Sequence, residues 1–307
     1  MKVLITGGAG FIGSHIAEYF SGKAEIVILD NLSTGSLNNL TGVDCRFIQG
    51  DVRNNDIVKD AVRGADIVFH LAAMVSVPES MKFPVVCADI NVNGMLNVLT
   101  ESVKAGVKTF IFSSSCSVYG NNPVIPKVET MMPEPESPYA VTKIDGEYYS
   151  NIFSGNSSVR TVCLRYFNVF GPRQKPDSDY AAVIPSFIVN ALKGRDLIIY
   201  GDGCQTRDFI YVKDVVRANV FAAENNINGI FNVACGNKIS VTELAEKILS
   251  LTGGGGGIIY QSERPGDVKH SVASVSKISA AGFNLSYNFD EGIKETISYY
   301  KKQNKWE

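Results

Sequence analysis

The stretch KVLITGGAGFIGSHIAEYF, residues 2–20, constrains the fold more than any other part of the chain. An apolar run typical of a β-strand leads directly into Gly7, Gly10 and Gly13, and a helical pattern follows. Glycines let the backbone turn tightly and approach a pyrophosphate, while the helix N-terminus offers free N–H groups and the positive end of its dipole. A strand, a glycine turn and a helix in this order predict a dinucleotide site.

Strand and helix patterns alternate through the first half of the chain. Segments of helical length separate six short apolar runs, which are KVLIT, EIVILD, CRFIQ, DIVFHLA, KTFIFSS and VRTVCLRY. Such runs indicate a parallel sheet that helices cover on both faces, and its crossovers are expected to be right-handed. The predicted fold class is therefore α/β, a Rossmann-type doubly wound parallel sheet.

The pattern loosens after residue 167. We expect a nucleotide-binding domain over residues 1–167, to which the chain returns near 207–235, and a smaller mixed α/β substrate domain over most of 168–307. SVTE, residues 240–243, is a capping box that opens a helix. The five-glycine run at 253–257 predicts a flexible connection.

Composition excludes several classes of partner. The chain has 307 residues, of which 45% are hydrophobic, and a net charge of −2, so it lacks the basic surplus that nucleic acid or an anionic membrane would require. Six scattered cysteines form no CxxC motif, which predicts reduced thiols and no metal site. The N-terminal apolar run is interrupted by glycines and too short to span a bilayer, and we expect a cytoplasmic protein.

Asp30 ends the second predicted strand. A carboxylate there can accept hydrogen bonds from the adenosine ribose and would repel a 2′-phosphate. No Lys or Arg occurs between Asp30 and Arg46 to attract one, which favours NAD over NADP. Asp51 and Val52 follow the third strand and are candidates for bracketing the adenine.

Tyr139 and Lys143 lie four residues apart in SPYAVTKIDGEYY. On one helix face they would be neighbours, but alone this spacing is a weak signal, because exposed helical pairs are common. SSSCSVYG, residues 113–120, precedes them. The combination of glycine turn, Asp30, this serine stretch and the Tyr–Lys pair resembles the extended short-chain dehydrogenase/reductase family over nearly the whole chain. Within it, RYFNVFGPRQ, GDGCQTRDFIYV and RPGDV are most similar to the UDP-glucose and UDP-N-acetylglucosamine 4-epimerases.

The resemblance implies a reaction without net redox change. Tyr139 would take the proton from the sugar 4-hydroxyl while hydride passes to bound NAD, the 4-keto sugar would turn over, and hydride would return to its other face. The resemblance assigns catalysis to Ser115, Tyr139 and Lys143. We expect the Lys143 ammonium and the nicotinamide charge to lower the pKa of Tyr139 toward neutrality.

The resemblance also implies the remaining contacts. The cofactor residues are Gly7, Gly10, Phe11, Ile12, Gly13, Asp30, Asn31, Ser33, Gly35, Asp51, Val52, Leu71, Ala72, Ala73, Asn91, Tyr139, Lys143 and Tyr166. The UDP-sugar residues are Ser76, Ser115, Asn168, Val183, Tyr200, Arg207, Arg264, Asp267 and Ser271.

Ser271 is the expected determinant of substrate size. In the family a tyrosine a few residues after RPGDV excludes a 2-N-acetyl group, and Ser271 matches that position. Serine leaves room, so we expect UDP-N-acetylglucosamine/UDP-N-acetylgalactosamine and also UDP-glucose/UDP-galactose as substrates. Val75 stands where relatives often carry lysine, and Cys116 where alanine or threonine is usual.

Other activities share this fold. Related dehydratases and decarboxylases carry acidic groups where this chain has Cys116 and Ser117, which disfavours both. A reductase that releases NAD and a non-catalytic NAD-sensing regulator are further alternatives.

The resemblance also implies a homodimer, formed through INVNGMLNVLTESVKAG and PYAVTKIDGEYYSNIF as a four-helix bundle. Met95, Val98 and Leu99 are the interface candidates, with packing against the chain's own sheet as the alternative.

Overall fold

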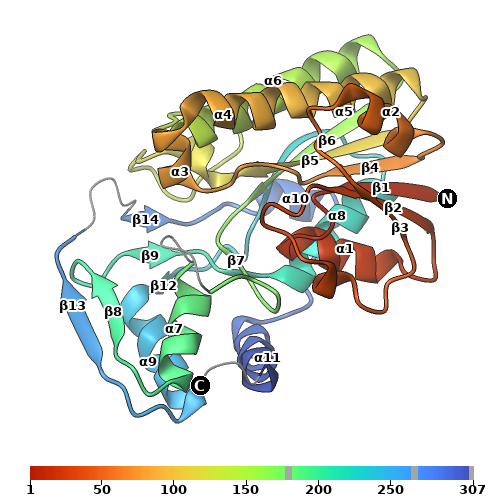
Figure 1. The fold of residues 1–307 in the computed structure, drawn as a ribbon. Helices are drawn as coiled ribbons and strands as arrows, with labels where there is room; N and C mark the ends of the chain where they lie inside the picture. Colours follow the sequence, from red (N-terminus) through yellow and green to blue (C-terminus); the bar gives the residue numbers. More distant parts are fainter. Residues whose placement is uncertain (177–181, 264–268, 304–307) are drawn as a thin grey trace.

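A seven-stranded parallel sheet lies at the centre of the molecule (Figure 1). The computed structural model describes residues 1–176, 182–263 and 269–303. The strand order is β3-β2-β1-β4-β5-β6-β11. The strands are β1 (Lys2–Thr6), β2 (Glu25–Asp30), β3 (Arg46–Gln49), β4 (Ile67–His70), β5 (Thr109–Ser115), β6 (Arg160–Tyr166) and β11 (Gly229–Val233). The six predicted strands and the Rossmann-type fold are confirmed.

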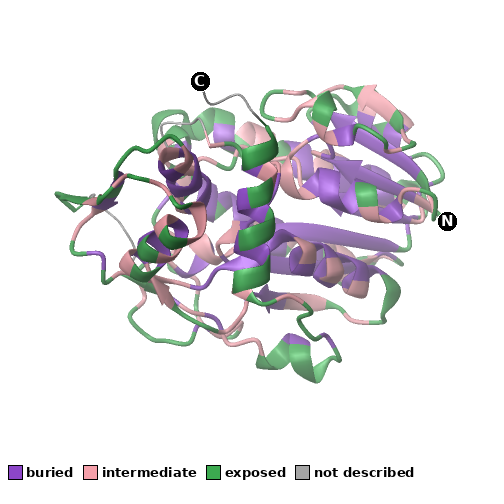
Figure 2. Ribbon diagram, turned by 90° about the horizontal axis from the view of Figure 1, so that it is seen from below, coloured by how far each residue is buried: buried purple, intermediate pink, exposed green. Residues whose placement is uncertain are grey.

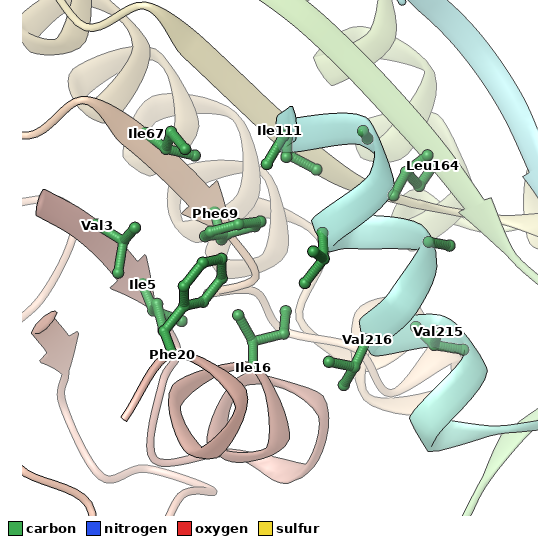
Figure 3. Close-up of a cluster of buried hydrophobic side chains, with 14 of the residues drawn as sticks. Val3, Ile5, Ile16, Phe20, Ile67, Phe69, Ile111, Leu164, Val215 and Val216 are labelled. Carbon is green, nitrogen blue, oxygen red and sulfur yellow. The ribbon is translucent and has the colours of Figure 1, made fainter. Parts of the chain in front are cut away.

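Helices cover both faces of this sheet (Figure 1). One face carries α2 (Asn55–Val62), α5 (Gly94–Lys104) and α6 (Pro138–Asn156), and the other carries α1 (Phe11–Phe20), α8 (Val212–Glu224) and α10 (Ser276–Ala280). Successive strand residues point to opposite faces, so Leu4 packs with the first group while Val3 and Ile5 pack with the second (Figure 3). Figure 2 shows the sheet strands buried along most of their length. Each large apolar side chain buried in this way contributes roughly 1.5–3 kcal/mol.

The second half of the chain builds smaller elements beside the sheet. They are β7 (Val169–Phe170) with β10 (Ile210–Tyr211), β8 (Leu197–Tyr200) with β13 (Ile258–Gln261), and the sheet β12-β9-β14 (Ile239–Ser240, Thr206–Arg207, His270–Ser271). Helices α7 (Val183–Leu192), α9 (Val241–Thr252) and α11 (Phe289–Lys302) pack around them. Their core includes Phe187, Leu244 and Ile293. Between β6 and α8 the chain thus leaves the central sheet, and it returns as β11.

Two local expectations have different outcomes. The capping box is confirmed, because Ser240 Oγ accepts from Glu243 N and the Glu243 carboxylate accepts from Ser240 N at the start of α9. The glycine run after α9 is more than a flexible connection. A Cβ at Gly254 would lie 2.4 Å from Ala191 O, and one at Gly256 2.1 Å from Arg195 O. These glycines let the chain cross closely over the end of α7.

The predicted interface residues are wrong. Met95, Val98 and Leu99 on α5 are 0% exposed, because they pack against the chain's own sheet and α2. Several of the exposed apolar side chains lie instead on the segment before α5 and on α6. That segment contains α3 (Val77–Lys82), α4 (Pro84–Ala88) and the π-helical turn η2 (Asp89–Asn93). Val77 and Phe83 of this segment are also exposed, and we give the name α4–α6 face to the six residues Met81, Val85, Val86, Val141, Tyr148 and Ile152.

Candidate active site

The glycine turn between β1 and α1 has the geometry that a pyrophosphate requires. Gly7 has φ +70°, and Gly10 occupies the N-cap of α1, where it offers no side-chain cap to the first amides. A Cβ at Gly13 would lie 2.3 Å from Gly7 O, so only glycine lets the helix start this close to the turn. The first-turn residues Phe11 and Ile12 follow directly. The residues present therefore fit a dinucleotide phosphate.

Asp30 holds the glycine turn as well as ending β2. Its Oδ2 accepts from Ala9 N at 2.9 Å, and its Oδ1 accepts from Leu32 N at 2.8 Å. The loop that contains Asn31 and Ser33 continues to Gly35, whose absent Cβ would lie 3.0 Å from Ala9. Each carboxylate oxygen retains a further lone pair, which a ribose hydroxyl could use. Asp30 thus joins the two backbone segments that a bound adenosine would contact.

The loop after β3 carries a charged cluster. Arg53 donates two hydrogen bonds of 2.9 Å to the Asp51 carboxylate, and Asn31 Nδ2 donates a third at 3.0 Å. These contacts hold the pKa of Asp51 well below its usual range. The Val52 side chain is buried against Gly94, so a contact with adenine would have to use its backbone.

The loop after β4 approaches the glycine turn. Leu71 N donates to Thr6 O at 3.1 Å, and Ala72 N lies 2.8 Å from the position of a Cβ on Gly7. Ala73 follows on the same loop. The predicted cofactor residues from β1 and β4 are therefore brought together at the carboxyl edge of the sheet.

Asn91 holds the loop after β4 in place through its side chain. Its Oδ1 accepts from Met74 N at 2.7 Å, and its Nδ2 donates to Met74 O and to Thr142 Oγ1, both at 3.0 Å. Asn91 is buried and lies in η2, a π-helical turn of the kind often found at functional sites. These bonds give Asn91 a supporting role between the loop and α6.

Ser115, Tyr139 and Lys143 lie together at the junction of β5 and α6. Ser115 ends β5, and Tyr139 stands in the first turn of α6, where its N–H donates to Ser80 Oγ at 3.2 Å. Lys143 Nζ donates to Ser113 O at 2.9 Å and lies 5.6 Å from the centre of the Tyr139 ring. Ser115 completes the group, because its hydroxyl is near enough to Tyr139 to lower the pKa of the phenol. Ser80 was not apparent from the sequence, because its role depends on contact with a distant helix.

The groups of the chain do not lower the pKa of Tyr139, contrary to the expectation from the sequence. Burial raises the pKa of Tyr139 to about 12, and only the Ser115 hydrogen bond opposes this effect. Burial also lowers the pKa of Lys143 to about 8. Desolvation therefore outweighs the attraction that the helical spacing suggested.

A buried ion pair anchors α6 to the sheet. Arg165 on β6 donates to Glu147 through Nε at 2.8 Å and through Nη2 at 2.6 Å, and Ser114 Oγ donates to the same carboxylate at 2.5 Å. Glu147 lies one turn after Lys143 on α6, a spacing that draws attention to Glu147 but does not reveal its partner Arg165 on β6. Tyr166 ends β6, with its ring in the core beside α8 and its hydroxyl bonded to Ser113 and Asn219. These contacts give Tyr166 a packing role.

The predicted substrate residues come from several elements. Asn168 Nδ2 donates to Asp208 O at 3.1 Å, and Arg207 on β9 pairs with Ser271 on β14. Ser271 is 9% exposed. The other members stand at element ends: Ser76 caps α3, Val183 begins α7 and Tyr200 ends β8. Arg264 and Asp267 lie outside the described residues.

Cys116 follows Ser115 in the short helix η3 (Cys116–Tyr119). Burial raises the pKa of its thiol to about 11. Val75, which replaces the lysine of many relatives, is exposed.

Across the described ranges, no group of three His, Cys, Asp or Glu side chains could hold a metal ion. No helix in those ranges is long and apolar enough to cross a membrane.

Comparisons with known proteins identify the family. Residues 3–234 match the model of the NAD dependent epimerase/dehydratase family. The chain is 38% identical to a putative UDP-glucose 4-epimerase of Methanocaldococcus jannaschii over 306 residues, which cover 99% of each chain. A UDP-N-acetylglucosamine 4-epimerase of Methanobrevibacter ruminantium, solved with UDP-N-acetylmuramic acid, superimposes with a TM-score of 0.96 at 40% identity over 98% of each chain. A UDP-glucose 4-epimerase of Thermotoga maritima, solved with UDP-glucose, gives 0.95 at 37% identity over 99% of each chain. The chain therefore belongs to the NAD-dependent epimerase/dehydratase family, and its relatives include UDP-sugar 4-epimerases of the extended short-chain dehydrogenase/reductase type.

Proposed function

We propose that this protein interconverts UDP-N-acetylglucosamine and UDP-N-acetylgalactosamine, and also UDP-glucose and UDP-galactose, by inverting carbon 4 of the sugar. The observation that carries the substrate range is the small side chain of Ser271, whose backbone stands opposite Arg207 where β14 pairs with β9. Similarity to 4-epimerases named for both kinds of sugar supports this range. A serine at this position leaves room that a tyrosine would fill.

The residues of the chain divide the chemistry among them. Tyr139 exchanges the proton of the sugar 4-hydroxyl, Ser115 orients that hydroxyl, and Lys143 binds the nicotinamide ribose. NAD, when bound, supplies the hydride acceptor and donor. Because burial favours the neutral phenol, Tyr139 needs added positive charge nearby to release its proton, and both the Lys143 ammonium and oxidised nicotinamide provide such charge.

The group beside Ser115 supports epimerisation over elimination or decarboxylation. At neutral pH, Cys116 is a neutral thiol, since burial raises its pKa to about 11. Ser117 follows it with a buried hydroxyl. Neither group can act as the carboxylate of the eliminating relatives.

The UDP moiety would provide most of the anchoring. Arg207, with its fork of donors, suits a diphosphate, and we assign Asn168, Val183, Tyr200, Arg264 and Asp267 to the same ligand. Ser76 would lie near the sugar.

We also propose a homodimer that forms through the α4–α6 face. Val85 is 80% exposed and Ile152 on α6 is 53% exposed. The exposed positions Val141, Tyr148 and Ile152 follow one another at spacings of seven and four, so they share one side of α6. A large exposed apolar surface of this kind marks an interaction site.

The test is incubation of the wild-type protein with UDP-glucose and with UDP-N-acetylglucosamine, separately, with the products resolved by NMR. We expect the C4 epimer from both sugars. Loss of water would identify a dehydratase. UDP-glucuronate, added as a third substrate because the other two sugars carry no carboxylate, tests for a decarboxylase through loss of CO₂. Turnover that consumes NAD stoichiometrically would identify a reductase. NAD binding without turnover of either sugar would favour the non-catalytic regulator.

A further inference from the structure

Asp208 is a buried carboxylate between β9 and β10 that joins separate parts of the chain. It is 0% exposed. Its Oδ1 accepts from Cys235 N at 2.8 Å, and its Oδ2 accepts from Gly236 N at 3.0 Å and from Ala273 N at 3.2 Å. Two of these amides follow β11 of the central sheet, and the third follows β14 of the smaller sheet. One side chain therefore holds the ends of two different sheets together.

Asp208 lies next to residues that we assign to the UDP-sugar. Asp208 directly follows Arg207, and its carbonyl accepts from Asn168 Nδ2 at 3.1 Å. Ala273 stands two residues after Ser271, which pairs with Arg207. Asp208 thus bonds Asn168, adjoins Arg207 and binds the backbone two residues after Ser271.

The segment that contains Ser271 has little other regular support. β14 has two residues, and only two residue pairs join it to β9. On its other side, Lys127 N donates to Val272 O and Ser274 N donates to Lys127 O, both at 2.8 Å. On the side of the central sheet, the Asp208 carboxylate accepts from Ala273 N, and Asn232 Nδ2 on β11 donates to Ser274 O at 3.3 Å. Buried amides in an irregular segment need such a partner, because an unpaired one costs about 1–3 kcal/mol.

We propose that Asp208 is a positioning residue that sets the place of Ser271 relative to Arg207, and through it the preference between N-acetylated and plain UDP-hexoses. This inference rests on the proposed function. Asp208 is not assigned any contact with carbon 4 or the 4-hydroxyl of the sugar. It acts through the backbone of residues 271–273.

The chain offers a matched control. Asp214 on α8 is also buried, and it also accepts two backbone bonds, from Ser286 N at 2.8 Å and from Tyr287 N at 3.1 Å. These donors precede α11, away from the residues assigned to the substrate, although Asp214 also faces Arg217. If Asp208 had only a structural role, as Asp214 does, replacing either aspartate would have the same effect on the preference between the two UDP-sugars.

The experiment compares Asp208→Asn with Asp214→Asn in the NAD-loaded protein. The asparagine amide at 208 would keep one acceptor oxygen but would turn its NH₂ group toward at least one of the three backbone N–H groups. We expect Asp208→Asn to change the ratio of kcat/KM for UDP-N-acetylglucosamine over UDP-glucose by about tenfold, the lower end of what a small change in pocket shape produces. Asp214→Asn should leave the ratio unchanged even if it lowers stability. Equal ratios in the two variants would overturn the proposal.

Two further measurements keep the outcome interpretable. If Asp208→Asn does not fold, Asp208→Ser replaces it, because a small hydroxyl can still accept one of the three bonds, and the same change in ratio is expected. If the wild type turns over neither sugar, the proposed function fails on its own, and hydrogen exchange then tests positioning directly. Faster exchange of the 271–274 amides in the Asp208 variant, but not in the Asp214 variant, supports positioning, and unchanged exchange refutes it.

Discussion

The Lys143 ammonium lies 5.6 Å from the centre of the Tyr139 ring and donates to the carbonyl of Ser113, so the helical pair is fixed to β5. Both side chains are buried, and burial moves their pKa values in opposite directions, Tyr139 to about 12 and Lys143 to about 8. Each group is shifted toward its neutral form. The fold thus holds the two groups close together and favours the neutral phenol, so charge supplied at the site would decide when Tyr139 ionises.

Tyr139→Phe should reduce turnover by about 100- to 10,000-fold, the usual contribution of a positioned acid–base group. UDP-sugar affinity should stay nearly unchanged, since the ring is retained and only the hydroxyl is lost. Steady-state rates and calorimetric titration with UDP-sugar measure the two effects. Full activity in this variant would exclude the assigned role.

Cofactor choice follows from Asp30. Its carboxylate is held at the end of β2 by Ala9 N and Leu32 N, where it would repel a ribose 2′-phosphate. The next arginine in the chain, Arg46, pairs with Asp60. We expect purified protein to carry NAD, and stripped protein to regain activity with NAD but little with NADP. Equal reactivation by both cofactors would contradict this assignment.

Ser271→Tyr should lower activity on UDP-N-acetylglucosamine by about 100-fold or more, because the larger side chain would clash with the N-acetyl group. Activity on UDP-glucose, which lacks this group, should be retained. His270→Tyr is the matched control. His270 is exposed and bonds Thr206, whereas its neighbour Ser271 is buried. The control should keep both activities, and loss of N-acetyl activity in both variants would mean that the effect is not specific to Ser271.

Ile152→Glu should convert a dimer into a monomer, because it places a charge in the α4–α6 face. Ile259→Glu, on the exposed edge strand β13, serves as the control and should not change assembly. Light scattering at micromolar concentration measures both masses. A monomeric wild type would refute the proposed homodimer.

His70 should make stability depend on acidity. It is buried, bonds Thr6 and stacks on Phe110 and Phe112, and burial lowers its pKa to about 3 from 6.5. Between these values the unfolded chain binds one proton more than the native chain, so stability falls as pH falls below 6.5, by up to about 1.4 kcal/mol per pH unit.

His70→Gln, which can still bond Thr6, should remove this dependence. Urea unfolding at pH 7 and pH 5 should show that the wild type loses about 2 kcal/mol more than the variant over this interval. Parallel losses in both proteins would show that another group titrates.

Local sequence was sufficient for the elements and the centre of the site. Strand runs, the Gly7–Gly10–Gly13 spacing, the capping box at Ser240 and the Tyr139–Lys143 pair are all short-range patterns, which reflect backbone sterics and helix periodicity. The structure contains the predicted strands and the α9 cap, and it brings Ser115, Tyr139 and Lys143 together.

Tertiary structure alone decided the features that depend on what lies opposite a residue. The pattern of α5 marks Met95 and Leu99 as apolar but does not say whether they meet the chain's own sheet or a second chain. The pKa of Tyr139 depends on how completely the fold removes water, which outweighs the neighbour that its spacing reveals. The pairing of Arg207 with Ser271, and the Asp208 bonds that hold it, join residues about 65 positions apart in the chain. Such contacts form only when the whole fold closes, because local pattern carries no information about distant partners.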